Sequence, residues 1–191
     1  MLTTSAIPAA VDPREFLADQ GLFGPSDDQI AAAGRVLVAA QDTVETATGR
    51  PLGARAVEFA AIAGLGCRWF SPVAPMAEVT SITWSHRGSA PVLVDPAGYW
   101  LEAAHDEPQI VFDAAALSAI ADGARLTIAA TVGADLETSR SAAVQAVRLI
   151  AGEWFNAALA VEEFNAARLS MGAWRLIKQA RYRRPAEWDS A

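Results

Sequence analysis

The sequence lacks most of the residues and motifs from which active sites and metal centres are built. Its 191 residues include one cysteine, Cys67, which excludes an internal disulfide and any metal site made of several cysteines. The two histidines, His86 and His105, each lie in a stretch that we predict to be a polar turn. Glycine-rich nucleotide-binding loops, Gly-x-Ser-x-Gly and His-Glu-x-x-His are all missing. We therefore predict no catalytic residue, no metal ion and no cofactor.

Long apolar runs are also missing. No run approaches the roughly 20 apolar residues of a transmembrane helix. The first residues contain neither the basic region nor the continuous apolar segment of a signal peptide. The lone cysteine, which we expect to be buried and inert, fits a reducing cytoplasm. These features predict a globular protein without a membrane partner.

Charge is unevenly distributed along the chain. Residues 1–163 carry 9 basic and 20 acidic side chains, residues 164–191 carry 6 basic and 2 acidic ones, and the net charge is −7. An acidic body repels nucleic acid phosphates, so we predict no specific binding of DNA or RNA. A basic tail on an acidic body is typical of an interaction segment.

Apolar residues at helical spacing predict three helices, over 12–20, 26–48 and 138–160. Asp12 is the expected N-cap of the first helix, and Ser26 with Gln29 forms a capping box for the second. The third helix is apolar around most of its circumference, so we predict that it is the central helix of the core. The core residues that we predict on the second and third helices are Ile30, Leu37, Val44, Val147, Ile150 and Trp154.

Between the second and third helices the apolar period changes from helical to two. Short strand-like stretches, such as the one with Thr80, Ile82 and Trp84 on one face, alternate with tight turns over residues 54–133. This pattern predicts an antiparallel β insertion. The predicted fold class is α+β: a helical bundle of long antiparallel helices with an inserted small antiparallel β-sheet and a C-terminal tail. The expected domains are a body at 1–163 and a basic tail at 164–191.

The basic tail allows two interpretations. It can form an amphipathic helix that packs on its own domain, with Ile177 on the apolar side. It can also be a docking segment that is poorly ordered in the free protein, because Gly172 interrupts the helical pattern. The partner-binding residues predicted by the second interpretation are Arg168, Trp174, Arg175, Lys178, Arg181, Tyr182, Arg183 and Arg184.

Several segments follow one another in a recognisable order. They are TGR at 48–50, FSPVAP at 70–75, EVTSITW at 78–84, YWL at 99–101, PQIVF at 108–112, LTIAATVGA at 126–134 and AVQAVRLIAGEWF at 143–155. Over residues 26–160 their order and spacing resemble the head–tail connector (adaptor, or head-completion) family of tailed bacteriophages and gene transfer agents. One departure is Thr131-Val132-Gly133, where relatives usually have an aromatic residue before a similar turn.

The resemblance implies a non-enzymatic structural protein that forms a homo-oligomeric ring, typically a dodecamer. Such a ring lies under the portal protein, extends the DNA channel and receives the next neck, stopper or tail-completion protein, while DNA passes without specific binding. The implied location is the head–tail interface of a virion or phage-like particle, assembled in the bacterial cytoplasm. The resemblance favours docking of the tail onto the portal. The alternatives are a small cytoplasmic regulatory or protein-binding module and an enzyme built around His105.

Overall fold

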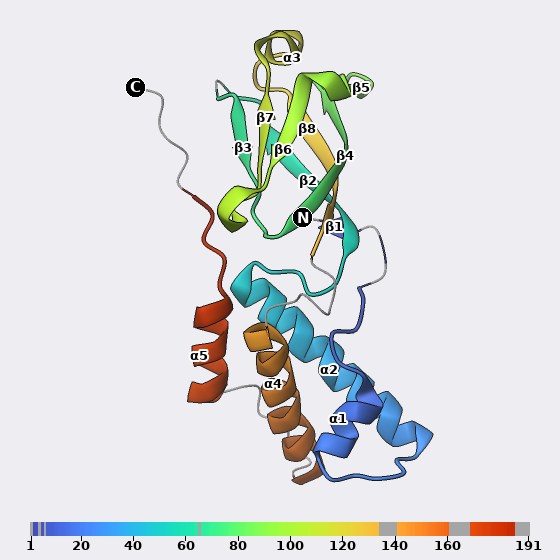
Figure 1. Ribbon diagram of the computed structural model, residues 1–191. Helices are drawn as coiled ribbons and strands as arrows, with labels where there is room; N and C mark the ends of the chain where they lie inside the picture. The colour runs from blue at the N-terminus through green and yellow to red at the C-terminus, as the bar shows by residue number, and fades with distance from the viewer. Residues whose placement is uncertain are drawn as a thin grey trace. The chain divides into compact units, whose positions relative to one another are not determined.

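The computed structural model describes residues 2–3, 5, 7–64, 66–133, 141–160 and 169–185. The chain divides into two compact units. We call residues 8–53 and 135–182 the helical unit, and residues 1–7, 54–134 and 183–191 the sheet unit. The sheet unit is thus mostly an insertion into the helical unit, and each unit is described by itself (Figure 1).

The helical unit contains four α-helices in its described part: α1 (Pro13–Asp19), α2 (Asp27–Thr48), α4 (Ser141–Ala160) and α5 (Met171–Ala180). Helix α4 packs against both α2 and α5, and α2 and α5 also contact each other (Figure 1). Helix α1 packs against α2 and is joined to α4 by an ion pair between Asp19 and Arg148. The helical unit is therefore arranged around α4, the helix that the sequence places at its centre.

The ends of α1 and α2 follow directly from local sequence. The Asp12 side chain accepts hydrogen bonds from the backbone N–H groups of Arg14 and Glu15. The capping box predicted for α2 is confirmed, because the Ser26 hydroxyl accepts from the Gln29 N–H and the Gln29 side chain accepts from the Ser26 N–H. Helix α2 ends at Gly49, whose φ of 66° is the left-handed conformation that glycine adopts without strain.

The core of the helical unit consists of buried apolar side chains. Leu37 and Val44 on α2 and Val147 and Ile150 on α4 are all buried in it. Ile30 and Trp154 lie at its edge and are only partly buried. The aromatic side chains at its centre are instead Phe16 and Phe155, whose rings meet edge to face with their centroids 5.8 Å apart.

The sheet unit contains two antiparallel sheets. The larger one has the strand order β1-β2-β8-β4-β5, from β1 (Leu2–Thr3), β2 (Arg55–Ile62), β8 (Arg125–Val132), β4 (Met76–Ser85) and β5 (Val92–Leu93). The smaller one has the order β3-β7-β6, from β3 (Arg68–Phe70), β7 (Gln109–Phe112) and β6 (Tyr99–Glu102). Strand β8 pairs with β2 over its whole length, from Arg55 opposite Val132 to Ile62 opposite Arg125. The last strand of the insertion is therefore central to the larger sheet.

Alternating residues of these strands form a separate hydrophobic core. Along β8 the burial pattern alternates, with Leu126, Ile128, Ala130 and Val132 buried. The short helix α3 (Ala114–Ala119) follows β7, and the 3₁₀ turns η1 (Pro96–Gly98) and η2 (Ala104–Asp106) flank β6. Gly98 lies so close to Ala116 that a Cβ atom there would be 2.7 Å from the alanine Cβ. Only glycine fits at this contact between η1 and α3.

The predicted bundle of long antiparallel helices is wrong. Helices α1, α3 and α5 have 7, 6 and 10 residues, and in the described part of the chain only α2, with 22, and α4, with 20, are longer. The strands form two sheets of five and three strands instead of one small sheet. The molecule is an α+β protein in which α1, α2, α4 and α5 form one unit and the two sheets with α3 form the other, and each unit has its own core. The expected boundary between residues 163 and 164 lies outside the described residues.

Candidate partner-binding surface

Helix α5 is an ordered part of the helical unit. The Ser170 hydroxyl accepts a hydrogen bond from the Ala173 N–H and caps its first turn, which accommodates Gly172. One side of the helix, with Ala173, Ile177 and Ala180, is 0–2% exposed and belongs to the same core as α2 and α4. The expectation of a poorly ordered segment at 168–184 therefore fails for residues 171–182, because burial of this apolar side stabilises the helix.

The C-terminal end of α5 is fixed to the loop that follows α2. The Arg50 Nε donates a hydrogen bond to the Ala180 carbonyl, at 2.6 Å, and so satisfies an acceptor that the helix end leaves open. The Tyr182 N–H donates to the Thr48 carbonyl at 2.7 Å. The Arg50 guanidinium also lies 5.8 Å from the centre of the Tyr182 ring, within the range of a cation–π contact. We call these contacts between the end of α5 and the loop after α2 the α5 joint. Tyr182 is 8% exposed, so its ring is buried in this joint and does not present a surface to a partner.

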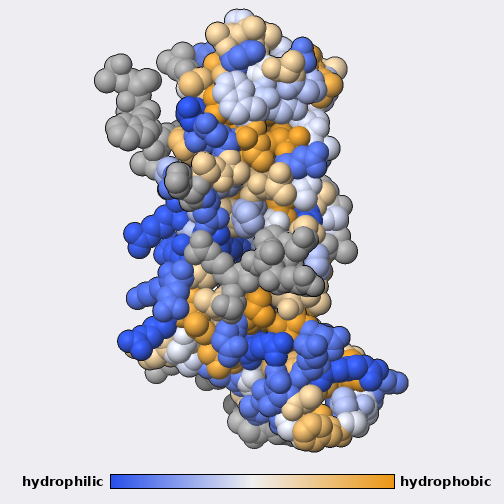
Figure 2. All heavy atoms as spheres, in the orientation of Figure 1, coloured by the Kyte–Doolittle hydropathy of each residue, from blue (hydrophilic) through white to orange (hydrophobic). Residues whose placement is uncertain are grey.

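The opposite side of α5 is basic and partly apolar. Trp174 is 47% exposed and Met171 is 82% exposed, and Arg175 and Lys178 are exposed beside them. Figure 2 shows hydrophilic side chains gathered along the side of the helical unit where α5 lies. No described carboxylate forms an ion pair with Arg175 or Lys178. We call this side, with Met171, Trp174, Arg175, Lys178 and Gln179, the α5 outer face.

The predicted partner-binding residues fall into three groups. Trp174, Arg175 and Lys178 share the α5 outer face, and Arg181 is exposed directly after the helix. Arg183 and Arg184 are exposed in the stretch that continues from Tyr182, whereas Tyr182 itself is buried. Arg168 lies outside the described residues.

A buried polar network at the C-terminal half of α2 was not predicted. The Gln41 side-chain amide donates to the Glu45 carboxylate at 2.9 Å and to the Pro8 carbonyl at 2.9 Å, and its oxygen accepts from the Ala10 N–H. The Glu45 carboxylate also accepts a hydrogen bond from the Leu52 N–H, at 2.9 Å, and so holds the segment that follows α2. Gln41 is 4% and Glu45 8% exposed. A glutamine and a glutamate one helical turn apart are the only trace of this network in the sequence, and the same pair is common on solvated helix faces.

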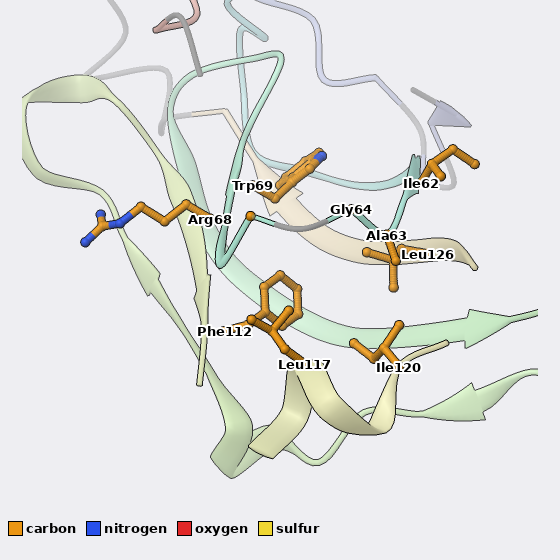
Figure 3. Close-up of a pocket in the computed structure, with 10 residues that line it drawn as sticks. Ile62, Ala63, Gly64, Arg68, Trp69, Phe112, Leu117, Ile120 and Leu126 are labelled. Carbon is orange, nitrogen blue, oxygen red and sulfur yellow. The ribbon is translucent and has the colours of Figure 1, made fainter. Parts of the chain in front are cut away.

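The hollows of the sheet unit are lined mainly by apolar side chains. The hollow between Trp69, Phe112 and Leu117 (Figure 3) has a volume of about 110 Å³, well below the ~300 Å³ of typical ligand pockets. The one charged side chain at its rim, Arg68, pairs with Glu102 at 2.8 Å. A second hollow of about 400 Å³ is lined mostly by apolar residues. Its two carboxylates, Asp95 and Asp113, accept hydrogen bonds from backbone N–H groups and serve as caps.

In the part of the chain that the structure describes, reactive and titratable side chains do not converge. Cys67 is exposed, so the expectation of a buried thiol is wrong; its carbonyl accepts from the Phe112 N–H while the side chain lies outside the core. Burial, and then the nearby Asp95 carboxylate, raise the pKa of the Tyr99 phenol above its ordinary value. Among the described residues, no group of three or more histidine, cysteine or carboxylate side chains could hold a metal ion. Nor does any helix of that part of the chain have the length and apolar character needed to cross a membrane.

The whole chain is similar to solved neck structures of gene transfer agent (GTA) particles. One match, titled "Neck of empty GTA particle computed with C6 symmetry", has a TM-score of 0.75 and 26% identity over 96% of both chains. A second, "Neck of native GTA particle computed with C12 symmetry", has a TM-score of 0.73 and 26% identity over 97% of both chains. A third, from the virion of a native GTA particle, has a TM-score of 0.73 and 25% identity over 96% of both. These matches confirm the predicted resemblance to the head–tail connector family of gene transfer agents.

The same matches give the location of this protein in the particle. The predicted location in a virion or phage-like particle is confirmed, because the similar chains come from particle necks and a virion. The coarse prediction of a structural head–tail role is confirmed with it. The two neck structures were computed with six-fold and twelve-fold symmetry, which indicates ring assembly. No protein-family model and no curated protein matches the sequence.

Proposed function

We propose that this protein is the adaptor of a phage-like particle, a non-enzymatic subunit that forms a ring of twelve copies under the portal. The observation that carries the proposal is similarity over 96–97% of the chain to neck structures computed with C6 and C12 symmetry. Full coverage matters because both units take part in the match. The absence of convergent reactive side chains in the described residues agrees with a structural role.

The charge of the chain fits a channel wall. A net charge of −7 disfavours contact with phosphates, so DNA slides through the ring without being held. The ring then extends the channel of the portal and receives the next neck or tail-completion protein on its other side.

The contact with the portal is proposed for the basic stretch after Tyr182. Arg183 and Arg184 are exposed and follow the joint that holds Tyr182 in the helical unit. Arginine pairs with carboxylates through two parallel hydrogen bonds, so two adjacent arginines can set the register of a docked partner. A chain that ends after Tyr182 keeps α5 and its joint intact and removes only this stretch.

The experiment is electron microscopy of the full chain mixed with its cognate portal. We expect twelve-copy rings coaxial with the portal. The chain ending after Tyr182, and the Arg183→Glu/Arg184→Glu variant, should fold but no longer bind the portal, while Arg87→Glu, an exposed arginine in a turn of the sheet unit, should bind normally. A protein that stays monomeric or dimeric with the portal present contradicts the adaptor function. Normal binding by both tail variants contradicts the portal contact alone.

A further inference from the structure

The helical unit has two exposed helix faces, one on α2 and one on α5. Helix α4 packs against both of these helices, and the side of each helix that points away from α4 is the exposed one (Figure 1). On α2, buried residues such as Leu37 and Val44 face α4, and the exposed residues lie on the opposite side of the helix. We call this side the α2 outer face; it carries Asp28, Ala31, Arg35, Val38, Ala39, Asp42 and Thr46. A unit with two different contact faces is suited to head-to-tail assembly into a ring.

The two faces are complementary in charge. The α5 outer face carries Arg175 and Lys178 and no acidic residue, and Arg181 extends it. The α2 outer face carries Asp28 and Asp42 against one arginine, Arg35. A basic face placed on an acidic face is attracted, whereas two copies of either face would repel each other. The charges therefore favour α5 against α2 and disfavour pairing of like faces.

The two faces are also complementary in size. The α5 outer face presents large apolar side chains, Trp174 at 47% and Met171 at 82% exposure. The α2 outer face presents Val38 at 59% exposure between the small residues Ala31 and Ala39, which leave room for an aromatic ring. Helix α5 spans about 15 Å and α2 about 33 Å, so the shorter helix can lie entirely along the longer one. Tryptophan and arginine are the residues that most often anchor protein interfaces.

We infer that the α5 outer face of each copy packs on the α2 outer face of the next copy in the ring, with Trp174 against Val38 and the basic residues near Asp42. The inference rests on the proposed ring and names the surfaces that build it. The partner of the α5 outer face is thus a second copy of this chain, and the portal contact is left to Arg183 and Arg184.

The experiment uses cysteine cross-linking in the full chain carrying Cys67→Ser, which removes the exposed native thiol. Val38→Cys and Trp174→Cys are introduced together, rings are assembled with the portal, and a short bis-maleimide is added. We expect a ladder of covalent dimers, trimers and larger species, because each copy is linked to two neighbours. An equal mixture of the two single-cysteine variants should give dimers and nothing longer. The matched control pairs Trp174→Cys with Ala18→Cys, which is exposed on α1, and should give no ladder.

Charge reversal tests the same contact without cross-links. Asp42→Lys or Lys178→Glu alone should raise the concentration needed for ring assembly about tenfold, and the double variant should restore it. Rings seen by microscopy without a Val38–Trp174 ladder would overturn the inference and leave the adaptor function standing. The absence of rings from the Cys67→Ser parent would overturn both. A ladder formed equally by the Ala18 control would show unspecific linkage and also contradict the inference.

Discussion

The most informative single substitution is Ile177→Ala, because it tests whether α5 is core or an appendage. Ile177 is 2% exposed, and its side chain lies in the core of the helical unit with Ala173 and Ala180. The substitution removes three buried carbon atoms. At about 0.8 kcal/mol for each carbon, the lost free energy of transfer from water into the core is about 2.4 kcal/mol. Part of the vacated space stays open, so we expect a total loss of about 3 kcal/mol, which is roughly a hundredfold in the unfolding equilibrium constant.

The measurement is amide hydrogen exchange of α4 and α5, with urea unfolding as a second readout. Local exchange is needed because a chain with two units need not unfold in a single step. Ile177→Val should lose about 1 kcal/mol, and the exposed Gln179→Ala should change stability by less than about 0.5 kcal/mol. If Ile177→Ala also changed exchange in α4 by less than about 0.5 kcal/mol, α5 would not be part of the core in solution, and the α5 outer face would have no fixed position.

Three further predictions concern the other features of the chain. Gln41→Leu should destabilise the helical unit by about 3 kcal/mol, because the buried Glu45 carboxylate loses the hydrogen bond from the Gln41 side-chain amide. The control is the exposed Thr46→Ala in the same urea titration, and an equal or smaller loss for Gln41→Leu would refute this. Phe155→Ala should lower the free energy of unfolding by about 3–5 kcal/mol, and Trp154→Ala by clearly less, because Phe155 is buried and Trp154 lies at the edge of the core. The reverse order in thermal unfolding would show that α4 is rotated about its axis. His86→Gln with His105→Gln should leave particle assembly and DNA delivery unchanged, and a folded double variant that assembles particles but does not deliver DNA would point to a catalytic or gating role.

The sequence predicted the helix ends, which depend on residues a few positions apart. Ser26 with Gln29 and the stop at Gly49 are visible in the sequence because caps are formed by residues a few positions apart. The pairing of β2 with β8 was not visible, because 77 residues separate Arg55 from Val132 and strand periodicity does not identify the partner. The single small sheet was expected for this reason, and two sheets were found.

The candidate surface was predicted in part. Trp174, Arg175 and Lys178 were selected by composition, and they do share one exposed side of a helix. Tyr182 was selected by the same reasoning, but its backbone bond to Thr48 and its contact with Arg50 depend on a loop about 130 residues earlier in the chain. The disorder expected from Gly172 did not take account of Ser170 as a cap, which places the glycine in the first turn, where it is tolerated.

The pairing of Arg55 with Val132 has a consequence for how the chain folds. These residues lie at the two points where the chain leaves and re-enters the helical unit, and antiparallel pairing holds their backbones about 5 Å apart. If residues 54–134 were unfolded, bringing α2 and α4 together would close a loop of that length, at an entropic cost of about 4 kcal/mol. Pairing of β2 with β8 closes nearly the same loop as packing of α2 on α4. Whichever of the two forms first therefore lowers the entropic cost of forming the other.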